Sequence, residues 1–94
     1  MTTAEFELAA KQALIQYLDE EYGEKYKIED IHVVWMCHII GDKKCLLIDN
    51  SRSMRYYEVT WNAPVQEMYL DVYEKTDKRE LEWDEVQKLM KGQT

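Results

Sequence analysis

Two histidines and two cysteines are the side chains of this chain whose types could support metal or thiol chemistry: His32, Cys37, His38 and Cys45. A structural zinc site needs four such ligands around one ion. His32 and His38 are about 20 Å apart along an extended strand, and one hairpin register that sets His38 opposite Cys45 supplies only two ligands. No C-x-x-C pair is present. We therefore predict neither a metal site nor a cofactor.

Thiol catalysis is the second chemistry that these residues could serve. A cysteine nucleophile needs a base aimed at its sulfur, but Cys37 and His38 are neighbours on a strand and so point to opposite sides. The chain has only three glycines, no phosphate-binding loop and little room for a pocket of several hundred Å³. We expect no enzymatic activity, and both cysteines are predicted to be buried, reduced thiols.

The amino-terminal region is predicted to be one long helix, from about Thr3 to about Tyr22. Its apolar residues fall at helical spacing, and Gly23 follows at the position where helices commonly end. Thr2 and Glu5 have the spacing of a capping box. The apolar stripe consists of Phe6, Ala9, Ala10, Ala13, Leu14, Tyr17 and Leu18.

The middle of the chain is predicted to be an antiparallel sheet. Four apolar runs separated by short polar links span residues 31–40, 45–48, 55–61 and 68–73. Short links favour a meander in sequence order, and the unbroken apolar run 45–48 suggests an interior strand covered on both sides. In the first run, alternation assigns Val33, Trp35, Cys37 and Ile39 to the core.

A short helix is predicted at the carboxy terminus, where four apolar residues recur at helical spacing: Trp83, Val86, Leu89 and Met90. A helix of about ten residues is marginal alone, so this stripe should be buried against the domain or a second copy. The predicted fold class is α+β, with the first helix packed on a four-stranded antiparallel meander. Residues 1–94 form a single domain.

The sheet face away from the first helix is the predicted interaction surface. Three uses compete for it: cover by the carboxy-terminal helix, self-association, or binding of another macromolecule. Tyrosine is favoured at such surfaces because it combines a large ring with a polar tip. The candidate residues on this face are Met36, His38, Tyr56, Tyr69 and Tyr73.

Charge defines a second candidate surface. The chain has a formal net charge of -7, and Asp19, Glu20 and Glu21 stack acids on the last turn of the first helix. One explanation is a solvated helix end neutralised by Lys25 or Lys27, and the other is an acidic patch for a basic partner. Positive charge gathers at only four positions: Lys43, Lys44, Arg52 and Arg55. Four cations beside an acidic body are too few to follow a phosphate backbone, so we expect no direct nucleic-acid binding.

The chain carries no sign of export or of membrane insertion. Residues 1–8 lack the basic flank and apolar run of a secretory signal. No uninterrupted apolar segment reaches the roughly 18 residues of a membrane-spanning helix. We therefore expect a cytoplasmic protein without a membrane partner.

Three segments, 33–37, 56–62 and 67–73, resemble a family of uncharacterised small proteins from phages and prophages of Gram-positive bacteria. The resemblance covers about Val33 to Lys75, and the helix-then-meander order is similar to the cystatin-like architecture. It implies a small protein that binds and modulates a host component, including as an acidic decoy. Our prediction is a non-enzymatic protein-binding module with an unknown protein partner. The alternative is a structural homodimer without a separate ligand, and the third reading is a small hydrolase or transferase.

Overall fold

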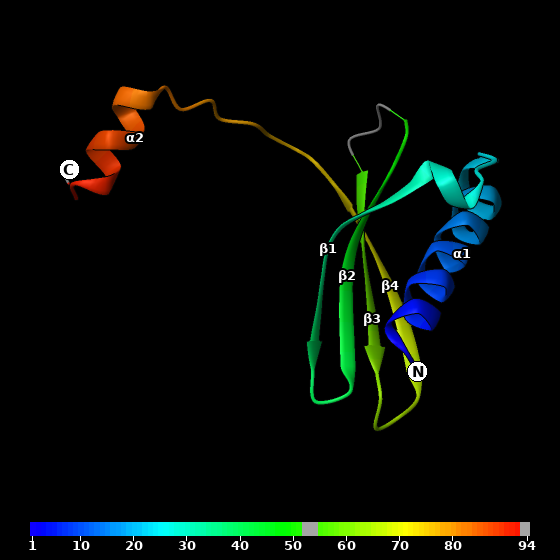
Figure 1. The fold of residues 1–94 in the computed structure, drawn as a ribbon. Helices are drawn as coiled ribbons and strands as arrows, with labels where there is room; N and C mark the ends of the chain where they lie inside the picture. The colour runs from blue at the N-terminus through cyan, green and yellow to red at the C-terminus, as the bar shows by residue number, and fades with distance from the viewer. Residues whose placement is uncertain (52–54, 93–94) are drawn as a thin grey trace.

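The computed structural model, which describes residues 1–51 and 55–92, has a long helix, a four-stranded sheet and a short second helix (Figure 1). The strands are antiparallel and lie in the order β1-β2-β3-β4, so the predicted α+β fold and its meander are confirmed. The elements are α1 (Thr3–Tyr22), a 3₁₀ turn (Ile28–Asp30), β1 (Ile31–Ile39), β2 (Asp42–Asp49), β3 (Arg55–Asn62), β4 (Glu67–Glu74) and α2 (Trp83–Met90).

Helix α1 begins and ends as predicted because both of its ends are capped. The Thr2 hydroxyl accepts a 3.1 Å hydrogen bond from the Glu5 backbone, and the Glu5 carboxylate accepts one of 2.7 Å from the Thr2 backbone. At the other end, Gly23 adopts a φ of 67° and its N–H bonds the carbonyl of Asp19 at 3.0 Å. Such a left-handed residue favours glycine because a Cβ would be strained there.

The core lies between α1 and one face of the sheet. Four residues of α1 at intervals of four are fully buried: Phe6, Ala10, Leu14 and Leu18. They pack with Cys45 and Leu47 of β2 and with Tyr57 and Val59 of β3. Burying each large apolar side chain contributes about 1.5–3 kcal/mol, and the small Ala10 lets the helix approach the strands closely.

A bulge in β1 overturns part of the predicted alternation. Val33 pairs with Leu47, but the next pair is Trp35 with Leu46, so Val34 is an extra residue. One extra residue exchanges the two faces for the rest of a strand. The assignment of Trp35, Cys37 and Ile39 to the core was therefore wrong. Trp35 is 40% exposed, Ile39 is 67% exposed, and Cys37 is exposed as well.

Strand β2 is interior, as predicted, because it lies between β1 and β3. The expectation that it is covered on both sides was wrong. Cys45 and Leu47 are buried under α1, but Ile48, which points to the other side, is 39% exposed. The second side is uncovered because α1 packs on one face only and α2 is not placed on the other.

Helix α2 stands away from the sheet at the end of an extended segment, residues 75–82 (Figure 1). The predicted helix is present, but its stripe is not buried against its own domain, since no residue of α2 is buried. The radius of gyration is 16.9 Å, whereas a compact domain of this length has about 12 Å. The extended arm accounts for the difference.

Candidate interaction surface

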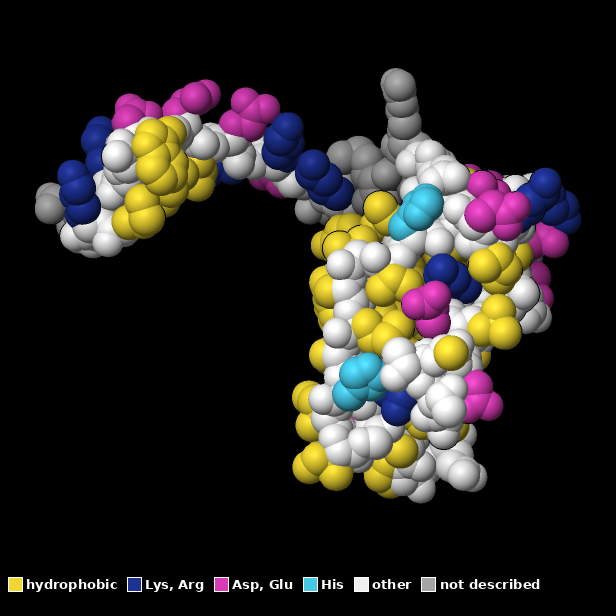
Figure 2. Space-filling model, in the orientation of Figure 1, with side chains coloured by type: hydrophobic (Ala, Val, Ile, Leu, Met, Phe, Trp, Pro, Cys, Tyr) yellow, Lys and Arg dark blue, Asp and Glu magenta, His cyan; other side chains and the backbone are white. Residues whose placement is uncertain are grey.

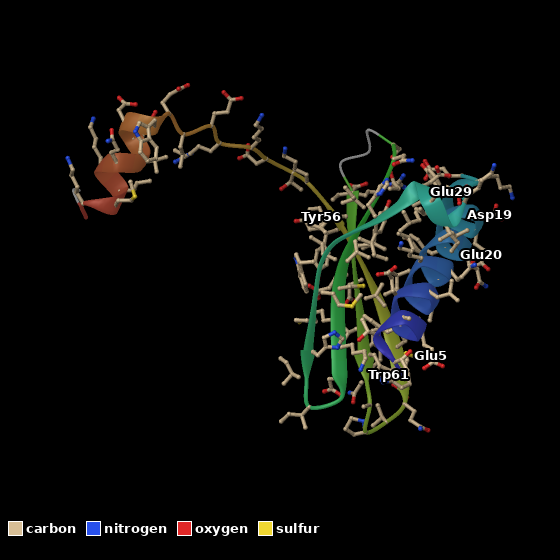
Figure 3. The ribbon with its side chains drawn as sticks, in the orientation of Figure 1. Glu5, Asp19, Glu20, Glu29, Tyr56 and Trp61 are labelled. Atoms are coloured by element: carbon tan, nitrogen blue, oxygen red, sulfur yellow. The ribbon has the colours of Figure 1, made fainter. Side chains whose placement is uncertain are left out.

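The sheet face that α1 leaves uncovered, called the open face below, is the largest candidate site. Its position follows from the pairing register, because residues that alternate with the buried ones point away from α1. Tyr56 lies on the side of the sheet away from α1 (Figure 3). The open face comprises Trp35, Cys37, Ile39, Lys44, Leu46, Ile48, Tyr56, Glu58, Thr60, Tyr69, Asp71 and Tyr73.

Tyrosines form the β3–β4 half of the open face. The rings of Tyr56 and Tyr73 are directly cross-strand and stack, with centroids 5.6 Å apart and planes 18° from parallel. The Tyr69 hydroxyl donates a 2.6 Å hydrogen bond to Glu67, and this bond raises the pKa of Tyr69. All three tyrosines are between 40% and 43% exposed. They thus present ordered aromatic surface to solvent, as binding faces do.

Three of the five predicted face residues lie on the open face, namely Tyr56, Tyr69 and Tyr73. The placement of Met36 and His38 was wrong, because the bulge turns both toward α1. Met36 pairs with Cys45 and packs against the core, and the His38 ring nitrogen lies 3.5 Å from the Thr3 hydroxyl of α1. Neither residue is therefore available on the surface for which it was proposed.

Sequence reasoning missed the apolar half of the open face, on β1 and β2: Trp35, Ile39, Leu46 and Ile48. Hydrophobic side chains follow the margin of the sheet that faces away from α1 (Figure 2). The signal available was the two-residue hairpin between Ile39 and Asp42, which fixes the register. If the pairs are counted back from Ile39 and Asp42, Met36 lies opposite Cys45. An alternation counted forward from Val33 assigns Met36 to the other face, so the two counts disagree.

Two acids lie side by side in the middle of the open face. Glu58 of β3 pairs directly with Asp71 of β4, and like charges at such a position repel each other. Lys44 compensates Glu58 through an ion pair of 3.2 Å. In the described part of the chain no ion pair is formed by Asp71. The β3–β4 half of the face thus has uncompensated negative charge.

A shallow hollow of about 270 Å³ lies at the hairpin end of the open face, lined by Cys37, Ile39, Asp42, Lys43, Lys44 and Thr60. It is slightly smaller than the roughly 300–1,000 Å³ of small-molecule sites. Cys37 and His38 point to opposite faces of β1, so this histidine is not directed at the thiol. Among residues 1–51 and 55–92, no three His, Cys, Asp or Glu side chains could together hold a metal ion.

The two cysteines differ in environment. Cys45 is fully buried, as predicted, and burial raises its pKa to about 11. Cys37 is exposed, which contradicts the prediction of a buried thiol and follows from the bulge. The structure therefore has one accessible thiol, on the open face, and one inert thiol in the core.

The second candidate surface, Asp19, Glu20 and Glu21, lies at the end of α1 and apart from the open face (Figure 3). Asp19 forms an ion pair with Lys25, which was one of the two lysines expected to neutralise this end. Glu20 accepts a 3.0 Å hydrogen bond from Gln16. Two of the three acids thus have partners within the chain, as in the interpretation of a solvated helix end.

Two of the four cations of the small basic patch are compensated within the chain. Arg55 is directed to the α1 side, where its guanidinium donates to both carboxylate oxygens of Glu24 at 2.8 and 3.1 Å. The same guanidinium lies 3.9 Å from the centroid of the Tyr22 ring. Lys44 is paired with Glu58 on the other face, and Arg52 lies outside the described residues. The charges on Arg55 and Lys44 thus serve internal contacts on opposite sides of the sheet.

Comparison with known proteins assigns the sequence to one known family. The sequence model of a family of unknown function, DUF6275, matches residues 7–83, which include nearly all of α1, the whole sheet and the extended segment. Neither the curated proteins nor the solved structures gave a match. In the described residues, no helix has the length and apolar character needed to cross a membrane.

Proposed function

Because the chain belongs to the DUF6275 family, whose function is unknown, we propose a function from the open face alone: a non-enzymatic module that binds another protein. The observation that supports this proposal is the contrast between the two faces of one sheet. The face under α1 is closed, whereas the open face exposes Trp35, Ile39 and Tyr56 by 40% or more. Exposed apolar patches with aromatic residues are typical of protein contact sites.

We further propose that the chain comes from a phage or prophage and that its partner is a protein of a Gram-positive host. The resemblance of its central segments to phage and prophage proteins supports this origin. The open face is a better candidate for the contact than the acidic end of α1. Its aromatic residues are 40% to 43% exposed, whereas Asp19 at the helix end is already paired with Lys25.

Affinity capture from a Gram-positive host lysate tests the proposal. The tagged chain is compared with Tyr69→Asp, which charges the open face, and with Gln12→Asp, which adds the same charge to the exposed side of α1. A captured protein is then purified and titrated against all three chains. We expect at least a 10-fold weaker affinity for Tyr69→Asp and no change for Gln12→Asp. Equal affinities for the three chains would exclude the open face as the contact.

A charge-reversed chain with Asp19, Glu20 and Glu21 changed to lysine tests the acidic decoy. A decoy binds through charge, so this variant should lose a partner that Tyr69→Asp retains. If the partner binds the open face, the charge-reversed chain should retain it and Tyr69→Asp should lose it. The two contacts are therefore separated in one experiment.

A further inference from the structure

Helix α2 has an apolar stripe that no other element of the described chain covers. Hydrophobic side chains gather on one side of the helix (Figure 2), where Trp83, Leu89 and Met90 are 62% to 66% exposed. A helix of eight residues is marginal in water unless packing stabilises it. The chain thus has two uncovered apolar surfaces, one on a short helix and one on a sheet.

We propose that α2 docks on the open face of a second copy of the chain, and that the two copies exchange their helices reciprocally. This inference rests on the proposed function, because it names the first protein segment that the open face binds. The helix stripe would lie over the apolar β1–β2 half, which includes Trp35, Leu46 and Ile48. Burying apolar surface on both sides is the driving force.

Charge on the open face is complementary to the last turn of α2, whereas the first turn of α2 carries Asp84 and Glu85. The β3–β4 half of the open face carries Glu58 and Asp71, which face each other across the two strands. The last turn of α2 and its cap carry Lys88 and Lys91. A helix seated with its stripe on β1 and β2 brings positive charge to the neighbourhood of these carboxylates. Such pairing orients the helix, with its basic last turn and not its acidic first turn near these carboxylates.

The segment between β4 and α2 favours a second copy over the helix's own sheet. To reach its own open face, the chain would have to reverse direction soon after Glu74. Residues 75–82 (KTDKRELE) include no Gly, Pro, Asn or Ser, and Asp77 is their one residue of a type that favours turns. The segment is instead extended and carries α2 away from the sheet (Figure 1). Short connections that resist reversal are a known route to exchanged dimers.

The buried area is sufficient for a stable pair. A dimer with two-fold symmetry would bury four patches at once, namely two helix stripes and two open faces. With a few hundred Å² in each patch, the total reaches roughly 1,200 Å² or more, the size of a specific interface. The α2 residues after Trp83 lie beyond the segment matched by the family, so the exchange is inferred for this chain.

Sedimentation velocity over a range of concentrations tests the exchange. Leu89→Asp charges the helix stripe and Trp35→Asp charges the β1–β2 half of the open face, and both residues are exposed, so the fold should survive. Ile40→Asp is the matched control, because Ile40 is fully exposed on the β1–β2 turn. We expect dimers for the unchanged chain and the control. For the face variant and for the helix variant, the dimer dissociation constant should rise at least about 100-fold. Each substitution is present in both copies, so it disrupts both symmetry-related contacts.

Mixing the two variants identifies the exchange itself. Leu89→Asp retains an intact face and Trp35→Asp retains an intact helix, so a mixed dimer restores one of the two contacts. We expect the mixture to form dimers at concentrations where each variant alone is a monomer. No mixed dimer can form if α2 docks on its own sheet.

Two results would overturn the exchange: an unchanged chain that is monomeric up to about 1 mM, or a dimer that Leu89→Asp leaves intact. Neither result affects the lysate experiment, in which the proposed function fails only if Tyr69→Asp binds the captured partner normally. If both proposals hold, Leu89→Asp should bind that partner more tightly, since it no longer fills the open face with α2.

Discussion

The hydroxyl of Tyr57 donates a 2.7 Å hydrogen bond to the carboxylate of Asp49, and both residues are buried between α1 and the sheet. The same carboxylate accepts a 2.8 Å bond from the Ser51 backbone and a bond from the Ser51 hydroxyl. Asp49 is the one buried charged residue of the described chain. Its charge is tolerated because three donors surround it.

Removing the Tyr57 hydroxyl should therefore be costly. We expect Tyr57→Phe to lower the free energy of unfolding by about 1–3 kcal/mol, because the buried carboxylate loses a donor that water cannot replace. Urea denaturation measures this loss. The neighbouring Tyr56→Phe, at an exposed hydroxyl, should change stability by less than about 0.5 kcal/mol. A loss of stability for Tyr57→Phe as small as that for Tyr56→Phe would show that the buried hydrogen bond contributes little.

Arg55→Lys should weaken the attachment of the α1 end to the sheet. The Arg55 side chain is 8% exposed, bonds both oxygens of Glu24 and lies over the Tyr22 ring. A lysine ammonium cannot make the same planar contacts, so we expect a loss of about 1–2 kcal/mol in denaturation experiments. Glu80→Gln breaks the exposed pair with Lys78 and should cost less than about 0.5 kcal/mol. Equal costs would contradict this account.

Ile40→Asn should stabilise the β1–β2 hairpin. Ile40 has a φ of 47°, and a β-branched residue is strained in that region, whereas asparagine tolerates it. We expect the free energy of unfolding to rise by about 1 kcal/mol. Val65→Asn, in the β3–β4 turn, makes the same chemical change at an exposed residue that does not have a positive φ. A gain at Val65 as large as that at Ile40 would point to solubility and not to backbone strain.

One thiol per folded chain should react rapidly with a thiol reagent at pH 8. Cys37 is exposed, while Cys45 is buried and has a pKa of about 11, so it contributes almost no thiolate at this pH. Cys37→Ser should remove the rapid reaction and leave Cys45 unreactive until denaturant is added. Rapid labelling of the Cys37→Ser chain would show that the core opens near Cys45.

Stability should fall at alkaline pH because of Cys45. Its folded pKa of about 11 exceeds the roughly 8.5 of an unfolded thiol, so the folded chain holds this proton more tightly. The contribution is complete below about pH 8.5 and is lost as the pH rises toward 11, by up to about 1.4 kcal/mol per pH unit. Denaturation curves at each pH measure it. Cys45→Ala, which has no thiol at this position, should show a shallower decline than the unchanged chain.

Local signals in the sequence were enough to predict α1, the strand order and the interior position of β2. The capping residues Thr2 and Glu5 and the helix-ending Gly23 act within a few residues, so their effect can be deduced without tertiary structure. Short links likewise leave few ways to connect four strands.

The candidate site was predicted only in part because its residues depend on register. The run from Ile31 to Ile40 is apolar at nearly every position, so the extra residue at Val34 leaves no break in the pattern. For the same reason Trp35 was assigned to the core and Met36 to the surface. The stripe of α2 was visible in the sequence, but a stripe does not identify the surface that it contacts.

The bulge at Val34 also affects how the sheet can grow. Strands β1 and β4 are the two outer strands, and an outer strand can recruit another chain through its unpaired backbone groups. The extra residue interrupts the regular spacing of these groups on β1. The bulge therefore disfavours edge-to-edge addition of another chain on the β1 side of the sheet.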